Sequence, residues 1–161
     1  MPGLLSREAQ YRPLFGPGLH VKTLDELRAV CVGSFPSSRT RDGIMSGLEG
    51  VVERLVRAQV RGKLIVNGSF LTEKIDPSDV DIVLEFDAVQ YDSGANEVRE
   101  PVDWLSTNLK DSHRCDSYAY PVYPVGHPYH PETLKARAYW RGWFGFDRGD
   151  QPKGMVVVEL T

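Results

Sequence analysis

The sequence predicts a protein of the α/β (α+β) class, organised as one domain over residues 1–161. Two short apolar runs, residues 64–66 and 82–84, have the composition of core strands. Segments with apolar residues at helical spacing lie before and after these runs. A length of 161 residues allows one hydrophobic core, and 41% hydrophobic with 25% charged residues is typical of a globular protein.

The first part of the chain predicts an arm and two helices. Residues 1–20 contain several prolines and glycines and are expected to form an irregular N-terminal arm. Thr23 suits the N-cap of a short helix over residues 23–32, because two acidic residues would lie in its first turn. A longer helix is expected over residues 39–59, where apolar residues recur at helical spacing.

The central part predicts two core strands, at residues 63–67 and 80–86, on the basis of their apolar runs. Residues 72–78 connect them with polar residues and a proline, which favour turns. Residues 87–100 are polar and are expected to form a loop.

Four further elements complete the expected order. Pro101 suits the first position of a helix, and an apolar stripe follows it. Residues 118–125 predict a third strand, which two internal prolines place at an edge of the sheet or end early. A helix over residues 132–143 and a closing strand over residues 155–160 follow.

Charge and cysteine content limit the possible environments and partners. A formal charge of -3 with a pI near 5.8 argues against a surface that coats nucleic acid, although a small basic patch can still lie beside an acidic centre. Cys31 and Cys115 have no metal-ligand spacing and are expected to be reduced, buried thiols. The chain shows no signal-peptide pattern and no apolar run of the roughly 20 residues that a membrane span needs. We therefore expect a cytoplasmic protein without a membrane partner.

The segment from Gly68 to Asp81 carries the strongest chemical signal. Asp79 and Asp81 are two residues apart at the start of a strand, so both carboxylates project from the same face and repel each other. A divalent cation would remove this repulsion, and carboxylate oxygens suit Mg²⁺. Gly68 allows the backbone to approach a phosphate closely, and the hydroxyl of Ser69 can donate to its oxygens. The pattern indicates a metal-dependent phosphoryl-transfer centre.

The arrangement of a strand, Gly68-Ser69, a short segment and Asp79-Val80-Asp81 on the next strand resembles the signature of the DNA polymerase β-like nucleotidyltransferase superfamily. The resemblance implies a minimal nucleotidyltransferase fold, in which helices flank a mixed β-sheet. It also implies a nucleoside triphosphate as donor and two Mg²⁺ ions as cofactors. A third carboxylate on a later strand is part of this resemblance.

Asp116 is the best match for that third carboxylate, because it precedes the third predicted strand after one intervening helix. Asp103 and Asp111 are weaker candidates, since they lie on or beside that helix. The resemblance implies that Asp79 and Asp81 hold the nucleotide-bound metal and share the second ion. Asp116 would bind that second ion and help to deprotonate the acceptor, while Gly68-Ser69 would bind the β and γ phosphates.

The whole chain is similar to a small bacterial group of nucleotidyltransferase-like proteins. The similarity lies in Gly18-Leu19-His20, in Gly68-Ser69-Phe70 together with Asp79 and Asp81, and in Pro152-Lys153-Gly154. Small members of the superfamily often belong to toxin-antitoxin or phage-defence loci, where they modify RNA or a partner protein. The acceptor of the nucleotide is therefore expected to be RNA, a protein or a small molecule. Lys153 is a candidate ligand of the triphosphate, with a solvated turn lysine as the alternative.

Other polar and aromatic residues admit two interpretations. His113 and Arg114 could meet phosphates or lie on the surface. The remaining histidines, His20, His127 and His130, have no spacing suggestive of zinc. A set of aromatic residues could stack a base or could pack a strand against a helix. These residues are Tyr118, Tyr120, Tyr123, Tyr139, Trp140, Trp143 and Phe144.

Three functional hypotheses follow. The first is an enzyme that transfers a nucleoside monophosphate from a triphosphate to an acceptor hydroxyl and releases pyrophosphate. The second is a catalytically inactive copy of the fold that acts as a binding or antitoxin-like module, which the small size of the chain favours and the three carboxylates disfavour. The third is a nucleic-acid-binding domain, for which the acidic balance is unfavourable.

Overall fold

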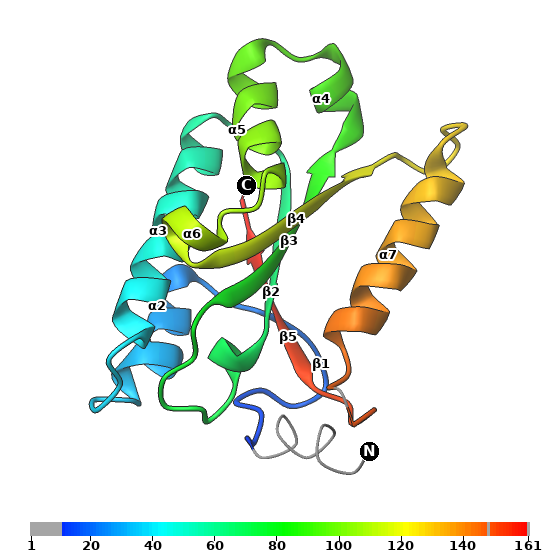
Figure 1. Ribbon diagram of the computed structural model, residues 1–161. Coiled ribbons are helices and arrows are strands. Elements are labelled where there is room, and N and C mark those ends of the chain that lie inside the picture. The colour runs from blue at the N-terminus through cyan, green and yellow to red at the C-terminus, as the bar shows by residue number, and fades with distance from the viewer. Residues whose placement is uncertain (1–10, 148, 161) are drawn as a thin grey trace.

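A mixed five-stranded β-sheet forms the centre of the protein in a computed structural model that describes residues 11–147 and 149–160 (Figure 1). The strand order is β1-β5-β2-β3-β4. The two outer pairs, β1/β5 and β3/β4, are parallel, and the inner pairs are antiparallel. The strands are β1 (Gly18–Val21), β2 (Gly62–Asn67), β3 (Val80–Asp87), β4 (Cys115–Val122) and β5 (Gly154–Glu159).

Helices cover both faces of this sheet (Figure 1). One face carries α2, α3, α5 and α6, whereas α7 lies on the other. This arrangement confirms the predicted α/β fold with a mixed sheet flanked by helices. The helices are α2 (Leu24–Arg28), the π-helical η1 (Ala29–Gly33), α3 (Arg41–Arg57), the 3-10 helix η2 (Ser69–Leu71), α4 (Ala88–Ser93), α5 (Asn96–Ser106), α6 (Lys110–His113) and α7 (His130–Phe144).

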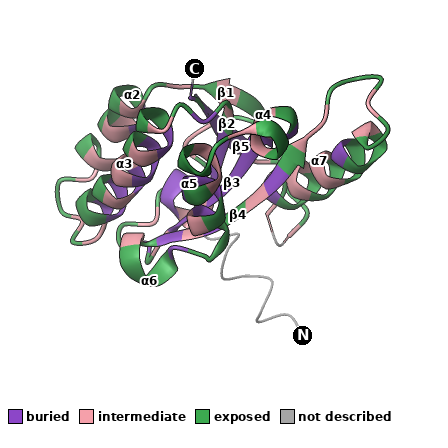
Figure 2. Cartoon of the chain, turned by 90° about the horizontal axis from the view of Figure 1, so that it is seen from above, coloured by how far each residue is buried: buried purple, intermediate pink, exposed green. Residues whose placement is uncertain are grey.

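The main core lies between α3 and the sheet. Ile44, Leu48 and Leu55 are fully buried on one side of α3 and pack in the same cluster as Ile82 and Leu84 of β3. Successive residues of a strand point to opposite faces, so β3 also contributes to the face below α7. Figure 2 shows buried residues concentrated on the strands and on the inner side of α3, whereas α7 is largely exposed.

A smaller core lies below α7, where Val83, Tyr120 and Phe144 belong to one buried cluster. A polar group is buried beside it. The Tyr120 hydroxyl donates to Glu85 Oε2 at 2.5 Å, and Arg141 of α7 lies 3.5 Å from the same oxygen. Burial and the carboxylate of Glu85 raise the pKa of Tyr120. These contacts join α7 to β3 and β4.

The N-terminal arm differs from the prediction in one segment. Residues 18–21 form β1, which pairs in parallel with β5 rather than remaining irregular. Pairing with a strand from the far end of the chain stabilises this short segment, and such pairing has no local sequence pattern. The predicted arm over residues 1–10 lies outside the described residues.

The prediction of a polar loop over residues 87–100 is wrong, because this segment forms α4 and the first half of α5. Asp87 caps α4, since its Oδ1 accepts a hydrogen bond from the Gln90 amide at 3.1 Å. Pro101 lies inside α5 rather than at its first position. Pro101 and Leu105 are buried, so packing against the core outweighs the loss of one helical hydrogen bond.

Several other boundaries agree more closely. Thr23 is the N-cap of α2, with a capping box formed by Thr23 and Glu26, although the predicted helix continues as a π-helix. β4 is an edge strand, as its prolines predicted, but it begins at Cys115, three residues before the predicted start. The helix predicted over residues 132–143 is α7. None of the helices in residues 11–147 and 149–160 has the length and apolarity needed to cross a bilayer.

Candidate functional site

Asp81 and Asp116 are directly opposite each other on β3 and β4. In a parallel pair, residues in register point to the same face, so both carboxylates lie on the face that carries α7. Asp79 immediately precedes β3, two residues before Asp81. The structure therefore brings together the three carboxylates that the sequence predicted.

The Asp81 carboxylate lies against Gly68. A β-carbon built on Gly68 would be 2.8 Å from Asp81 Oδ2 and 3.1 Å from its Cγ. Gly68 also has φ 97° and ψ -173°, a conformation that favours glycine. The glycine of the Gly68-Ser69 turn thus provides the space that the Asp81 carboxylate occupies.

The pKa of Asp81 reflects its burial and the negative charges near it. Burial is the main cause that raises its pKa, and the charges of Asp79 and Asp116 raise it further. Lys153 and Lys110 act in the opposite direction, and the resulting pKa is about 7. Charged residues from separate segments of the chain therefore act on one another at this end of the sheet.

Lys110 is the first residue of α6 and forms an ion pair with Asp79, with 3.3 Å between Nζ and Oδ2. The neighbouring Asn108 has a positive φ of 66° and donates from Nδ2 to Asp116 Oδ1 at 2.6 Å. One short turn before β4 therefore places a cation beside Asp79 and an amide beside Asp116.

Two further side chains lie beside the carboxylates. Burial, the charge of Asp116 and a hydrogen bond to it raise the pKa of Tyr118. Lys153 precedes β5, and its charge lowers the pKa of Asp81, which places it within electrostatic range of that carboxylate.

Arg41 holds the segment that follows the Gly68-Ser69 turn. Its side chain is fully buried and lies 3.8 Å above the centre of the Phe35 ring. The guanidinium donates to the carbonyl oxygens of Cys31 (2.9 Å), Phe70 (2.7 Å), Thr72 (2.6 Å) and Lys74 (2.5 Å). Its planar fork of donors therefore fixes the backbone just beyond Ser69, which is the first residue of η2.

The side chains of Asp79, Asp81 and Asp116 carry oxygen atoms, which are the donors that a hard cation such as Mg²⁺ prefers. The space beside Gly68 lets Asp81 lie next to the turn. Within the described residues, no group of three or more His, Cys, Asp or Glu side chains is arranged as a metal site. Asp79 and Asp116 are instead engaged by Lys110 and Asn108.

The weaker candidates lie elsewhere. Asp103 accepts a hydrogen bond from the Tyr91 hydroxyl at 2.6 Å, and Asp111 is exposed on α6. The ring of His113 packs edge-on against Trp104, with 5.1 Å between ring centres, and Arg114 lies beside Gly43 of α3. His113 and Arg114 are thus directed towards α3, away from the face that carries Asp81 and Asp116.

The remaining histidines contact nearby backbone atoms. His20 Nε2 lies 2.7 Å from the Gly16 carbonyl, and His130 Nδ1 lies 2.9 Å from the Tyr123 carbonyl. His127 Nδ1 accepts a hydrogen bond from the Tyr129 amide at 3.0 Å. Each ring therefore has a local backbone partner.

The aromatic residues divide into two groups. Tyr120 and Phe144 are buried in the core below α7, as the packing interpretation predicts. Tyr139 and Trp143 are exposed on α7 with their rings nearly parallel, 6.5 Å apart. Tyr118 packs against Trp140 of α7, with 4.8 Å between ring centres, and so joins this helix to the strand of Asp116.

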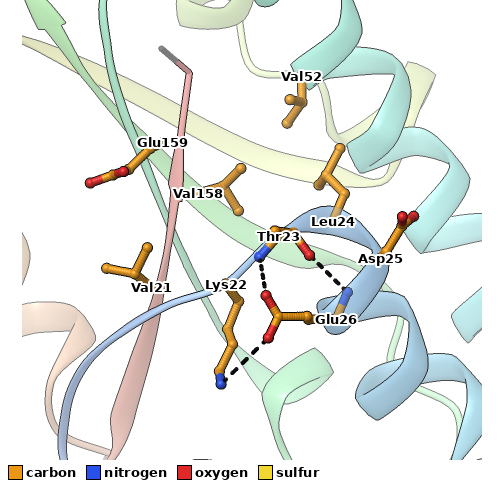
Figure 3. A pocket seen from close by; sticks show the side chains of 9 residues that line it. All are labelled: Val21, Lys22, Thr23, Leu24, Asp25, Glu26, Val52, Val158 and Glu159. Atoms are coloured by element: carbon orange, nitrogen blue, oxygen red, sulfur yellow. Dashed lines mark hydrogen bonds and ion pairs between the residues drawn. The ribbon is translucent and has the colours of Figure 1, made fainter.

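An open hollow of about 500 Å³ lies at the other end of the sheet (Figure 3). Its lining residues come from the ends of β1 and β5, the start of α2 and Val52 of α3. Figure 3 shows, among its polar groups, the capping box of Thr23 and Glu26 and the ion pair of Glu26 with Lys22. Glu159 is paired with Lys63 at the opposite end of β2 from Asn67, which pairs with Asp81. The hollow therefore does not belong to the carboxylate site.

Sequence reasoning missed Asn108, Lys110 and Arg41 as parts of this site. Asn108 could have been noticed as an asparagine between two helical segments, because asparagine tolerates a positive φ. Arg41 and Lys110 have no local signal, since their partners lie on distant segments of the chain.

Comparison with known proteins identifies the family of the chain. No curated protein and no solved structure shows significant similarity to the chain. A family profile matches residues 8–159, which is nearly the full length. The chain therefore belongs to DUF6932, a family of unknown function.

Proposed function

We propose that this protein is a nucleotidyltransferase that moves a nucleoside monophosphate from a nucleoside triphosphate to an acceptor hydroxyl. The observation that carries the proposal is the pairing of Asp81 with Asp116 beside Gly68. Asp79 completes the group, and Gly68-Ser69 lies next to it. The resemblance of the sequence to the polymerase β-like superfamily supports the same reaction.

The reaction breaks one bond to the α-phosphorus and forms another. The acceptor oxygen attacks the α-phosphorus, and the bond from that phosphorus to the oxygen bridging to the β-phosphorus breaks. Pyrophosphate leaves, and the proton of the acceptor hydroxyl passes to a carboxylate. In this assignment Asp116 receives that proton, with the Asn108 amide holding its Oδ1 at 2.6 Å.

The carboxylates also explain the need for a cation. Mg²⁺ held by Asp79, Asp81 and Asp116 would neutralise the charge of the phosphates during transfer. Burial is the main cause that raises the pKa of Asp81 to about 7, and the charges of Asp79 and Asp116 raise it further. The contribution of these two charges supports this role, because neighbouring carboxylates favour added positive charge. Ser69 and Lys153 are assigned to the triphosphate, to which a hydroxyl and an ammonium can donate.

The test is a labelling experiment with the full chain. The purified protein is incubated with Mg²⁺, each of the four nucleoside triphosphates labelled at the α-phosphate, and separated RNA, protein and small-molecule fractions of a bacterial extract. We expect label to appear in one fraction together with released pyrophosphate. The labelled fraction identifies the class of acceptor, including the RNA or protein targets expected of a toxin-antitoxin or phage-defence enzyme.

The matched variants are Asp116→Asn and Asp111→Asn. Asp116→Asn removes a carboxylate of the site. We expect the rate of nucleotidyl transfer to fall about a thousandfold or more, which is typical when a catalytic side chain is lost. Asp111→Asn changes an exposed carboxylate on the neighbouring α6 and should leave transfer unchanged. Equal activity of the two variants would contradict the assignment of Asp116.

A second candidate is a catalytically inactive module of the same fold that binds a partner. The ion pair of Lys110 with Asp79 favours it, because an internal cation lessens the demand for a metal ion. Calorimetry with Mg²⁺ and ATP separates the two candidates: metal-dependent nucleotide binding supports the enzyme, and its absence supports the inactive module.

A further inference from the structure

Lys110 forms an ion pair with one of the three carboxylates of the proposed site. Its Nζ lies 3.3 Å from Asp79 Oδ2, and the side chain of Asp79 is only 17% exposed. Asp79 lies two residues before Asp81, which is paired with Asp116 on β4. The ammonium therefore lies at the end of the sheet where the three carboxylates are gathered.

The backbone that carries Lys110 is firmly anchored. Leu109 is buried, and its amide donates to the Ser117 hydroxyl of β4 at 2.9 Å. The Ser117 hydroxyl in turn donates to the Leu105 carbonyl of α5 at 2.7 Å. The Lys110 amide donates to Asn108 Oδ1 at 3.0 Å, while Nδ2 of the same Asn108 side chain holds Asp116. The base of Lys110 is thus fixed to the strand of Asp116.

The side chain of Lys110 extends largely into solvent. Its exposed fraction is 59%, and four methylene groups separate the ammonium from the backbone. An exposed ion pair contributes little to stability, so it is broken easily when a stronger partner arrives. A divalent cation offers the carboxylates twice the charge of an ammonium at shorter distance.

We propose that Lys110 is a displaceable counter-ion. Its ammonium balances Asp79 while no cation is bound, and it moves from Asp79 to the triphosphate when Mg²⁺ enters. The proposal rests on the nucleotidyltransferase function proposed above. It assigns one side chain two successive partners, a carboxylate and then a phosphate, while the anchored turn of Asn108 and Leu109 holds the backbone of Lys110 in place.

The experiment measures binding to the full chain by calorimetry, with Mg²⁺ alone and with a non-hydrolysable ATP analogue plus Mg²⁺. Lys110→Met removes the charge and retains the length of the side chain. We expect it to bind Mg²⁺ alone about fivefold more tightly, because the competing ammonium is absent, and the Mg²⁺ analogue complex about tenfold more weakly. Lys63→Met removes an exposed lysine at the opposite end of β2 and should change neither affinity.

A second readout follows Lys110 in the unchanged protein. Its rate of acetylation by acetic anhydride, measured by mass spectrometry, should rise on addition of Mg²⁺, when Asp79 releases it. The rate should fall below its starting value when the ATP analogue is added, because the phosphate then covers the ammonium. The rates at Lys63 should stay constant through both additions.

The outcomes separate the two proposals. If Mg²⁺ binds to the wild-type protein and Lys110→Met binds it equally or more weakly, the counter-ion exchange is wrong and the proposed function stands. A constant acetylation rate at Lys110 through both additions leads to the same conclusion. If neither protein binds Mg²⁺, both the exchange and the proposed function are wrong.

Discussion

Asp81 and Asp116 are paired across two adjacent parallel strands, although α4, α5 and α6 lie between them in the chain. On its other side, Asp81 is paired with Asn67, the residue before Gly68. One position of β3 therefore has a carboxylate on one side and the start of the Gly68-Ser69 turn on the other. The site depends on three strands being in this register.

Replacement of Asp81 by asparagine should stabilise the metal-free protein at high pH. The folded state raises the pKa of Asp81 from 3.8 to about 7, so ionisation of this carboxyl destabilises the fold. The penalty is fully present above pH 7, declines as the pH falls and is lost below about pH 4. At about 1.4 kcal/mol per pKa unit, the penalty is at most ~4 kcal/mol. Urea unfolding of Asp81→Asn and of the wild-type protein, in EDTA at pH 8 and at pH 4, measures the difference in stability between the two proteins. An equal difference at both pH values would show that ionisation of Asp81 does not cause it.

Replacement of Gly68 by alanine should destabilise the protein and move the Asp81 carboxylate. The new β-carbon would lie 2.8 Å from Asp81 Oδ2, and φ 97° is strained for alanine. We expect a loss of about 1–3 kcal/mol in urea unfolding. Gly142→Ala is the matched control, because nothing lies within 4 Å of its added carbon on α7, and it should be neutral or stabilising by up to about 1 kcal/mol. The prediction fails if both variants have the same stability.

Replacement of Arg41 by methionine should be strongly destabilising, because four carbonyl groups lose their donor in a buried region. We expect a loss of about 3 kcal/mol or more in the free energy of unfolding. Arg57→Met removes an exposed arginine that pairs with Glu53 on α3 and should cost less than about 1 kcal/mol. Similar urea midpoints for the two variants would show that Arg41 does not anchor this segment.

Two substitutions of Asn108 should separate its backbone role from its side-chain role. Both Asn108→Gly and Asn108→Ala lose the hydrogen bond to Asp116, so both should lower nucleotidyl transfer by about tenfold, as for loss of a bond to a charged group. Alanine must also adopt φ 66°, so its variant should be about 1 kcal/mol less stable than the glycine variant. Thermal unfolding and transfer rates measure the two effects. Equal stabilities would contradict the backbone role, and unchanged transfer would contradict the side-chain role.

Elements with local signals could be located from the amino-acid sequence. The apolar runs of β2 and β3 and the apolar stripe of α3 marked their positions, because burial of one face imposes a period on the sequence. Gly68-Ser69 and the pair Asp79 and Asp81 were found for a similar reason, since they flank the ends of recognisable strands. Helices α4 and α5 escaped detection, because their stability comes from packing that outweighs polar composition and Pro101.

The groups that surround the carboxylates depend on the assembled fold. The parallel pairing of β3 with β4 placed Asp116 beside Asp81, and the anchored turn before β4 placed Lys110 beside Asp79. Arg41 reached the segment after Ser69 because α3 packs across the same end of the sheet. Electrostatic and hydrogen-bonding contacts act through space over a few ångströms, so residues distant in the chain combine into one site only once the strands are in register.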